Sequence, residues 1–410
     1  MDIPGLPARR AALTMLDAVL RRGETLDQAA PSALGRVRSD ADRALSRAIA
    51  AEVLRWKFDL DSLIDSATRK NLPDDAKPRV VLSMMLAQWL RFETPPHAVI
   101  ATGLPLLAGG PRRLAHGVFS ALVKQGVTLP AAPTLSEPVR MRWGDRADAI
   151  AAALALPPPV DLTLRDARET QVWAEKLGGI SLMPGHLRLP RGQAIESLEG
   201  YAEGFWWVQD IAASLPARLL GPGEGRTVLD VCAAPGGKTL QLAAAGWNVT
   251  ALDNSAKRLE RLRENLERTG LKAEVIVADA LRWSPGTYVD AILLDAPCTA
   301  TGTCRRHPDV LHRIGPRQIE EMAELQASLI ARASDWLKPG GEMTYSVCSL
   351  EPEEGEDQIE NAALDAAPVT AEFLPQGIVS APQGWLRTDP AMLSEVGGMD
   401  GFFISRFINK

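Results

Sequence analysis

Apolar side chains recur every three or four positions over the first 128 residues, which is the repeat of helices with one buried face. Four stretches show this repeat clearly, at residues 9–23, 42–65, 76–92 and 111–126. They are separated by residues that end helices, namely Gly23, Pro73, Pro95, Pro96, Gly109, Gly110 and Pro111. The pattern predicts a compact all-α bundle over residues 1–128.

The pattern changes after this bundle. A linker of residues 128–138 is rich in Pro and Ala. Beyond the linker, helical patterns alternate with short strand-like runs, at residues 142–156, 161–166, 169–179 and 186–190. We therefore predict a small α/β subdomain over residues 139–205.

From residue 206 onward, short apolar runs typical of strands alternate with helical patterns. The clearest runs cover residues 227–232, 248–253, 273–279 and 289–295. This order predicts a mostly parallel sheet with helices on both faces, as in doubly wound, Rossmann-like α/β folds. We assign it to a third domain, residues 206–410.

A turn with two glycines follows the first of these runs, and a helical pattern begins at its end. The turn consists of Ala233, Ala234, Pro235, Gly236, Gly237 and Lys238. Such a turn presents backbone N–H groups to a ligand. A phosphate-binding P-loop would need a glycine where Cys232 stands, and the dinucleotide pattern GxGxxG is absent. The turn therefore indicates a nucleoside-like ligand without phosphate.

Acidic residues end the next three runs, at Asp253, Asp279 and Asp295. One acidic residue after a strand is more often a helix cap. Three in series beside a glycine turn favour a cofactor crevice at one edge of the sheet. In this interpretation Asp253 holds the ribose hydroxyls.

Four motifs closely resemble those of the nucleolar-protein/Sun family of RNA cytosine-C5 methyltransferases, namely DVCAAPGGKT at 230–239, DAPCTATG at 295–302, RRHPDV at 305–310 and DGFF at 400–403. Residues 1–128 are similar to the antitermination factor NusB, an RNA-binding helical domain that precedes the methyltransferase in this family. Three positions depart from the family pattern: Thr299, Val347 and Gly355 stand where Ser, Thr and Asn are usual. None of these departures removes a group expected to do chemistry.

The resemblance implies roles for particular residues. C5 of cytosine is a poor nucleophile, so an enzyme of this kind first adds a thiolate to C6. Cys348 is implied to be this nucleophile, and Cys298 to assist proton removal and release. Asp295 is implied to bind the N3 edge of the base. The implied cofactor is S-adenosyl-L-methionine, held by the turn Ala233–Lys238, by Asp253 at the ribose, by Asp279 near the adenine, and by Arg258 and Asp295.

An RNA substrate follows from the same resemblance. We expect 16S ribosomal RNA, with transfer RNA as the alternative, and a non-catalytic RNA-binding scaffold as a further one. The target base must be unpaired or flipped out, because duplex RNA hides C5 and C6. Arg305–Pro308 is expected to contact the RNA backbone near that base, since guanidinium groups suit phosphate. For Lys238, contact with substrate, lowering of a thiol pKa and capping of the turn all stay open.

Charge is distributed unevenly along the chain, although the net charge is only −6. Residues 1–128 hold 18 Lys and Arg against 13 Asp and Glu, whereas residues 129–410 hold 27 against 38. This asymmetry suits a basic, RNA-facing module joined to an acidic catalytic body. A solvated helical surface would give the same basic excess.

The N-terminus lacks the apolar segment of a signal peptide, and no apolar run has the length of a membrane span. We therefore expect a cytoplasmic monomer with reduced thiols and no membrane partner. The four cysteines form no CxxC pair, so no zinc site is expected. Cys232 and Cys304 are expected to be small buried apolar side chains.

Overall fold

The structure is a computed structural model that describes residues 3–410. The chain forms two compact units, one made of the residues up to Leu156 together with Cys304–Ile314, and the other of Pro157–Thr303 with Gly315–Lys410. The expected domain limits at residues 128 and 139 therefore fall inside the first unit. The RRHPDV motif also belongs to this unit, although it lies between two strands of the expected catalytic domain.

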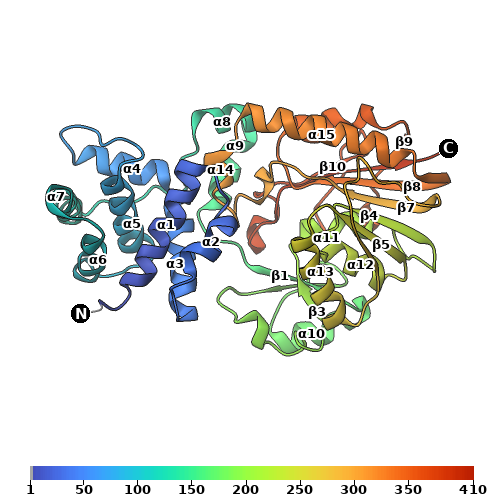
Figure 1. Ribbon diagram of the computed structural model, residues 1–410, viewed down its shortest axis with the longest axis horizontal. Helices are drawn as coiled ribbons and strands as arrows, with labels where there is room; N and C mark the ends of the chain where they lie inside the picture. Colours follow the sequence, from blue (N-terminus) through green and yellow to red (C-terminus); the bar gives the residue numbers. More distant parts are fainter. Residues whose placement is uncertain (1–2) are drawn as a thin grey trace. The chain divides into compact units, whose positions relative to one another are not determined.

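The first unit is all helical, as the apolar repeat predicts (Figure 1). Its helices are α1 (Leu6–Arg22), α2 (Leu26–Leu34), α3 (Asp40–Arg55), α4 (Lys57–Ser66), α5 (Lys77–Arg91), α6 (Pro96–Gly103), α7 (Gly109–Gln125), α8 (Glu137–Trp143), α9 (Ala147–Leu154) and α14 (Val310–Arg313). The sequence pattern missed α2, a short helix with a capping box between Thr25 and Gln28. The predicted helix 42–65 is interrupted at Trp56, whose backbone leaves the helical region.

Hydrogen bonds hold the segment Cys304–Ile314 within the helical unit. Arg55 Nη2 donates to the Arg305 carbonyl at 3.0 Å, and His312 Nε2 lies 2.6 Å from the Leu54 carbonyl. Arg305 itself is only 1% exposed. The expectation that this arginine contacts an RNA backbone is therefore wrong for the arrangement seen, because its side chain is buried.

The second unit begins with a small antiparallel sheet, in the order β2-β1-β3. Its elements are β1 (Val160–Leu164), α10 (Thr170–Leu177), β2 (His186–Leu189) and β3 (Trp206–Val208). The two strands predicted from the sequence are present. The third strand, β3, begins at Trp206, one residue beyond the expected subdomain limit at 205. It belongs to the small sheet, because Trp206 pairs with Leu164 rather than with the large sheet.

The large sheet has the order β10-β11-β8-β7-β4-β5-β6, and β9 pairs with β11. Its strands are β4 (Thr227–Val231), β5 (Asn248–Asp253), β6 (Glu274–Val277), β7 (Val289–Asp295), β8 (Leu337–Val347), β9 (Asp365–Ala367), β10 (Leu386–Arg387) and β11 (Phe403–Ile408). β4 to β8 are parallel, whereas β11 runs antiparallel to β8. This confirms the predicted Rossmann-like arrangement.

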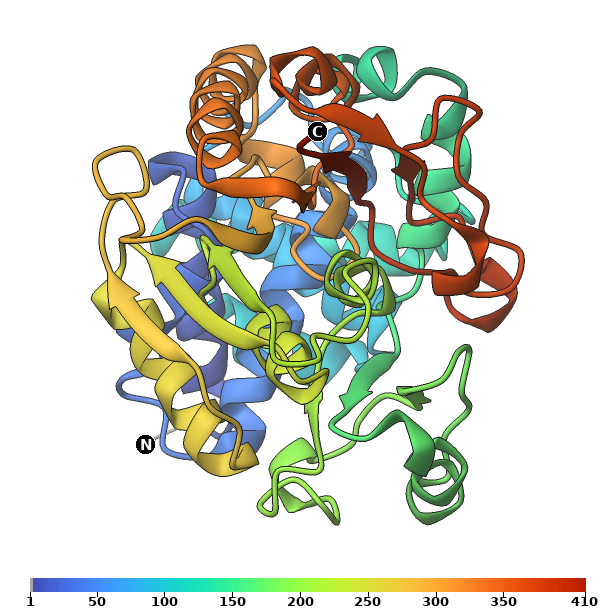
Figure 2. The ribbon, with the colours of Figure 1, turned by 90° about the vertical axis from the view of Figure 1, so that its right-hand side faces the viewer.

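Helices cover both faces of this sheet (Figure 2). They are α11 (Ile211–Arg218), α12 (Gly237–Ala244), α13 (Ala256–Thr269) and α15 (Pro316–Ser334). Successive strand residues point to opposite faces, so Leu229 of β4 packs with α15 while Val228 packs with α11 and α12. The helices cover the faces of the sheet and leave the carboxyl ends of its parallel strands open.

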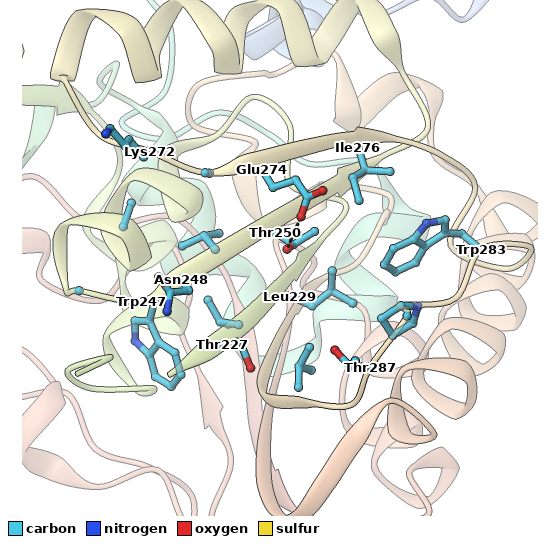
Figure 3. Close-up of a pocket in the computed structure, with 18 residues that line it drawn as sticks. Thr227, Leu229, Trp247, Asn248, Thr250, Lys272, Glu274, Ile276, Trp283 and Thr287 are labelled. Carbon is cyan, nitrogen blue, oxygen red and sulfur yellow. Dashed lines mark hydrogen bonds between the residues drawn. The ribbon is translucent and has the colours of Figure 1, made fainter. Parts of the chain in front are cut away.

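A hollow lies over β4, β5 and β6 near the amino ends of the strands (Figure 3). The connection of residues 278–288 between β6 and β7 contains no helix to cover it. Thr250 donates a hydrogen bond to Glu274 there, and Trp247 and Trp283 also line it. None of the predicted site residues is among its lining residues, so the candidate site lies elsewhere.

Within residues 3–410, no helix combines the length and the apolar character that crossing a membrane requires.

Candidate active site

A pocket of about 490 Å³ opens at the carboxyl ends of β4, β5, β7 and β8. Sites for small molecules typically measure about 300 to 1,000 Å³. The predicted site residues that line this pocket are Ala234, Asp253, Arg258, Asp279, Asp295, Cys298 and Cys348. One sheet edge therefore brings predicted cofactor residues and both predicted catalytic cysteines to a single cavity.

The other predicted cofactor residues do not line the pocket: Ala233, Pro235 and Gly236 lie in the turn between β4 and α12, and Gly237 and Lys238 begin α12. Gly236 has a φ of 108°, and a Cβ there would lie 2.2 Å from Leu262 Cδ1 of α13. Glycine is thus required both by the left-handed backbone and by the close approach of the turn to α13.

A buried acidic residue, missed in the sequence, ties this turn to the sheet. Thr239 Oγ1 of α12 donates to Asp230 Oδ2 of β4 at 2.5 Å. Burial raises the pKa of Asp230 to about 7. In the sequence, Asp230 stands out as a charged residue inside the otherwise apolar run 227–232.

Asp253 braces the turn from the end of β5. Its Oδ2 accepts a hydrogen bond from Ala234 N at 3.2 Å, and its Oδ1 accepts one from Ser255 N at 2.9 Å. Arg258 Nη1 lies 3.6 Å from the same carboxylate, and Arg258 also donates to the Ala234 carbonyl. Asp253 thus lines the pocket with a carboxylate whose position is set by its neighbours.

Asp279 stands two residues after β6 and is more open. Its Oδ1 accepts a hydrogen bond from Leu281 N at 3.0 Å, and its side chain is 48% exposed. An exposed carboxylate beside the pocket can reach a bound ligand without the cost of a fully buried charge.

The two predicted catalytic cysteines lie on loops that follow the neighbouring parallel strands β7 and β8. Their Sγ atoms are 3.4 Å apart. Gly302 N donates to the Cys348 carbonyl at 3.0 Å, and Gly401 N donates to the Gly302 carbonyl at 2.8 Å. The DAPCTATG and DGFF motifs and the segment around Cys348 therefore meet at one place, which sequence spacing did not reveal.

The pKa values of two thiols that line the pocket, Cys298 and Cys232, are raised for different reasons. The hydrogen bond from Cys348 is the largest cause that raises the pKa of Cys298 well above its ordinary value, and burial and the charge of Cys348 add to it. Burial raises the pKa of Cys232 to about 12. Cys232 was expected to be a plain buried side chain, yet it lines the pocket with a φ of 64°. Cys304 is fully buried, as expected.

Asp295 is held from two sides beside these cysteines. Lys238 Nζ lies 2.7 Å from Asp295 Oδ2, and Ser346 Oγ donates to Oδ1 at 2.7 Å. Lys238 also lies over the Phe402 ring, 5.3 Å from its centroid. The structure adds a role for Lys238 that was not among the three left open, as the charge partner that orients Asp295.

The three departures from the family pattern have structural counterparts. Thr299 keeps the hydroxyl of the usual Ser, and this hydroxyl bonds to Glu354. Val347 is fully buried in the core beside α15. At Gly355, a Cβ would lie 2.4 Å from Arg387 Nη2 and 2.8 Å from Phe403 Cγ, so the more usual Asn would displace these neighbours.

Several lining residues carried no sequence signal. Leu325 and Leu329 of α15 form an apolar wall, and Asn254 follows Asp253 at the rim. These positions are brought to the pocket by packing of α15 across the strand ends, which no local pattern specifies.

The fold and the pocket define the class of S-adenosyl-L-methionine-dependent methyltransferases. More narrowly, residues 217–408 match the family model described as 16S rRNA methyltransferase RsmB/F, and residues 6–106 match the NusB family. The chain belongs to the RsmB/F family of RNA methyltransferases, which confirms the resemblance seen in the motifs.

Individual relatives agree with this assignment. The chain is 33% identical to ribosomal RNA small subunit methyltransferase B of Klebsiella pneumoniae subsp. pneumoniae, and the match covers 98% of each chain. A methyltransferase homolog protein from Pyrococcus horikoshii is similar with a TM-score of 0.55 and 26% identity, over 71% of this chain and 98% of that one. NSun6 from the same organism, solved with SFG, has a TM-score of 0.58 and 19% identity, over 67% and 98% of the two chains, and shows the shared fold.

The cofactor is S-adenosyl-L-methionine, and the pocket fits it. The carboxylates of Asp253 and Asp279 suit hydroxyl and amino groups of a nucleoside, and Leu325 and Leu329 suit the face of an adenine ring. The pocket continues to Asp295 and both cysteines, so a bound cofactor and a target base can share one cavity.

Asp253→Ala is expected to weaken S-adenosyl-L-methionine binding. Hydrogen bonds to charged groups contribute about 1.5 to 3 kcal/mol, so the affinity should fall about tenfold or more. Isothermal titration calorimetry measures the effect. Asp290→Asn is the control, because Asp290, like Asp253, accepts a hydrogen bond from a backbone N–H, but does so from Thr227, the first residue of β4. Equal affinities in wild type and Asp253→Ala would show that Asp253 does not hold the cofactor.

Proposed function

We propose that this protein methylates C5 of a cytosine in 16S ribosomal RNA through a covalent adduct between Cys348 and C6 of the base. The observation that carries the proposal is the 3.4 Å contact between the sulfurs of Cys298 and Cys348, inside the pocket that also contains Asp253 and Asp295. The two thiols lie where the cofactor pocket meets the ends of two strands, which favours a catalytic role over a structural one.

Cys348 supplies the nucleophile. Its thiolate adds to C6, and the electron pair of the C5–C6 double bond moves toward C5 and the base ring. S-adenosyl-L-methionine supplies the methyl group that the activated C5 accepts. Asp295 faces the pocket and would hold the N3 edge of the base, while Lys238 and Ser346 fix the direction of its carboxylate.

Cys298 then allows the product to leave. The largest cause of its raised pKa is Cys348, and that cause disappears once the Cys348 sulfur is bonded to C6. Loss of that hydrogen bond favours the Cys298 thiolate, whose own proton passes to solvent, and this thiolate would then remove the proton from C5. The C5–C6 double bond forms again and Cys348 departs as a thiolate. The contact between the sulfurs would thus place Cys298 beside the adduct from which the C5 proton must be removed.

Ribosomal RNA is favoured as substrate by the family and by the relatives, which are named ribosomal RNA small subunit methyltransferase B. The basic excess of residues 1–128 supports an RNA partner for the helical unit. We propose that this unit contacts the RNA backbone and that the α/β unit acts on a base taken out of the stack.

Bisulfite sequencing tests the proposal. RNA from a strain that lacks the gene should lose protection at one cytosine of 16S ribosomal RNA, and the intact gene should restore it while the Cys348→Ala gene should not. Loss of protection in a transfer RNA alone would replace the proposed substrate. Unchanged protection of every cytosine in both RNA classes would contradict a cytosine-C5 activity.

A further inference from the structure

A buried carboxylate links the two cysteine loops. Glu354 ends a short turn, η6 (Pro352–Glu354), and has no exposed surface. Its Oε1 accepts hydrogen bonds from Thr299 N at 2.8 Å and from Gln326 Nε2 at 3.1 Å. Its Oε2 accepts hydrogen bonds from the hydroxyls of Thr299 and Ser349. Four donors therefore converge on one carboxylate.

Two of the residues that donate to Glu354 are the chain neighbours of the two cysteines. Thr299 directly follows Cys298, and Ser349 directly follows Cys348. Glu354 thus joins the residue after one sulfur to the residue after the other. A change at this carboxylate therefore acts on both loops at once, through the chain neighbour of each cysteine.

Further bonds make the link rigid. Gln326 of α15 also donates to the Pro297 carbonyl at 2.8 Å, on the other side of Cys298. The Tyr345 hydroxyl donates to the Glu354 carbonyl at 2.7 Å, which ties η6 to β8. Each end of the link is therefore attached to a strand or helix of the fold.

Glu354 is itself removed from the chemistry. It is absent from the residues that line the pocket and is fully buried, so it does not touch cofactor or base. Burial raises its pKa, which means that the fold bears a cost for placing the group there. An apolar residue would avoid that cost but could not accept the four hydrogen bonds.

We propose that Glu354 is a positioning residue that sets the distance and direction between the Cys298 and Cys348 sulfurs. This rests on the proposed function of the two cysteines and deepens it. Reactions of this kind need the reacting atoms within a few tenths of an ångström of the productive geometry, and a misplacement of about 1 Å can lower the rate about a hundredfold.

Glu354→Ala and Glu354→Gln test the proposal in the full-length protein. The alanine variant should lower kcat by about a hundredfold while the affinity for S-adenosyl-L-methionine stays within about twofold of wild type. The glutamine variant should recover most of kcat. Its amide oxygen can accept the bonds from Thr299 N and Gln326, and its NH₂ group can donate to the two hydroxyls, which are able to accept.

Two further variants separate positioning from stability. Asp290→Asn removes a carboxylate that holds Thr227 and Lys338 at the opposite end of the sheet, so it should lower Tm without lowering kcat. Thr299→Val should reproduce part of the loss in kcat, whereas Thr299→Ser should not, because it keeps the hydroxyl.

A readout without methylation keeps the inference distinct from the proposed function. The oxidant diamide removes one hydrogen from each thiol and joins the two sulfurs, and the rate depends on how they are placed. Glu354→Ala should form the Cys298–Cys348 disulfide about tenfold more slowly than wild type and Asp290→Asn. Equal oxidation rates, or a Glu354→Ala protein with lower Tm and wild-type kcat, would overturn the positioning role. If the wild-type protein methylates no cytosine while Glu354→Ala is still oxidised more slowly than wild type, the proposed function alone is overturned.

Discussion

Cys348→Ala should abolish both methylation and covalent attachment to RNA. Alanine has no sulfur to add to C6, and without that addition C5 stays unreactive. Loss of a required nucleophile commonly lowers kcat by about 10⁴-fold or more, so no turnover should be detected. Transfer of radiolabelled methyl groups to target RNA, followed by denaturing gel electrophoresis, measures methylation and attachment together.

Cys298→Ala should behave differently. Cys348 can still attack and C5 can still accept the methyl group, but removal of the C5 proton stalls. A protein–RNA adduct that resists denaturation should therefore accumulate, and it should require both the cofactor and the target RNA. The double variant should form none.

The pair of variants separates catalytic from structural thiols. Two structural thiols would yield two similar, partly unstable proteins without an adduct. Accumulation of the adduct in Cys348→Ala would exchange the two roles, and full activity in both variants would end the mechanism. Wild-type Tm in each variant is the control that folding is intact.

The largest expected effect on stability lies in the small sheet, at Asp161. This residue of β1 is fully buried and accepts two hydrogen bonds from Arg188 of β2, at 2.7 and 2.8 Å. His186 Nε2 lies 3.5 Å away, and Ile211 N, at the start of α11, donates to the same carboxylate at 3.1 Å. Asp161 thus joins the small sheet to the helix that leads into the large one.

Asp161→Ala is expected to lower the free energy of unfolding by about 3 to 5 kcal/mol, because removal of one partner leaves the other charge buried and unpaired. Urea denaturation measures the change. Asp166→Asn in the same subdomain is the control, since the ion pair of Asp166 with Arg168 is largely exposed and contributes little. A loss at Asp161 no larger than at Asp166 would contradict the role of the buried pair.

The same pair predicts a pH dependence. Burial opposes ionisation of Asp161, but Arg188 and His186 outweigh it and hold the pKa of this carboxyl well below its usual range. An acid with a lowered pKa in the folded state stabilises the protein above its unfolded pKa of about 4, and the stability is lost as the pH falls below that value. The difference in unfolding free energy between wild type and Asp161→Asn should therefore be constant between about pH 5 and 8 and shrink toward about pH 2.

Local sequence determined the elements of this protein and the chemistry at their ends. The three-to-four repeat specifies the helical bundle, and the alternation of apolar runs with helical patterns specifies a parallel sheet, because each element must bury one face. Parallel strands end at one edge, so the positions of Asp253, Asp295 and Cys298 at the ends of apolar runs are enough to predict a common crevice.

Only the tertiary structure decided how distant segments meet. The 3.4 Å contact of Cys298 with Cys348, the link through Glu354 and the inclusion of Arg305 in the helical unit all join residues that are far apart in the chain or belong to different elements. Side-chain periodicity reports which face of an element is buried, but not which partner covers it. The packing of the helices and the register of the strands supply that information, and they set the geometry on which the proposed chemistry depends.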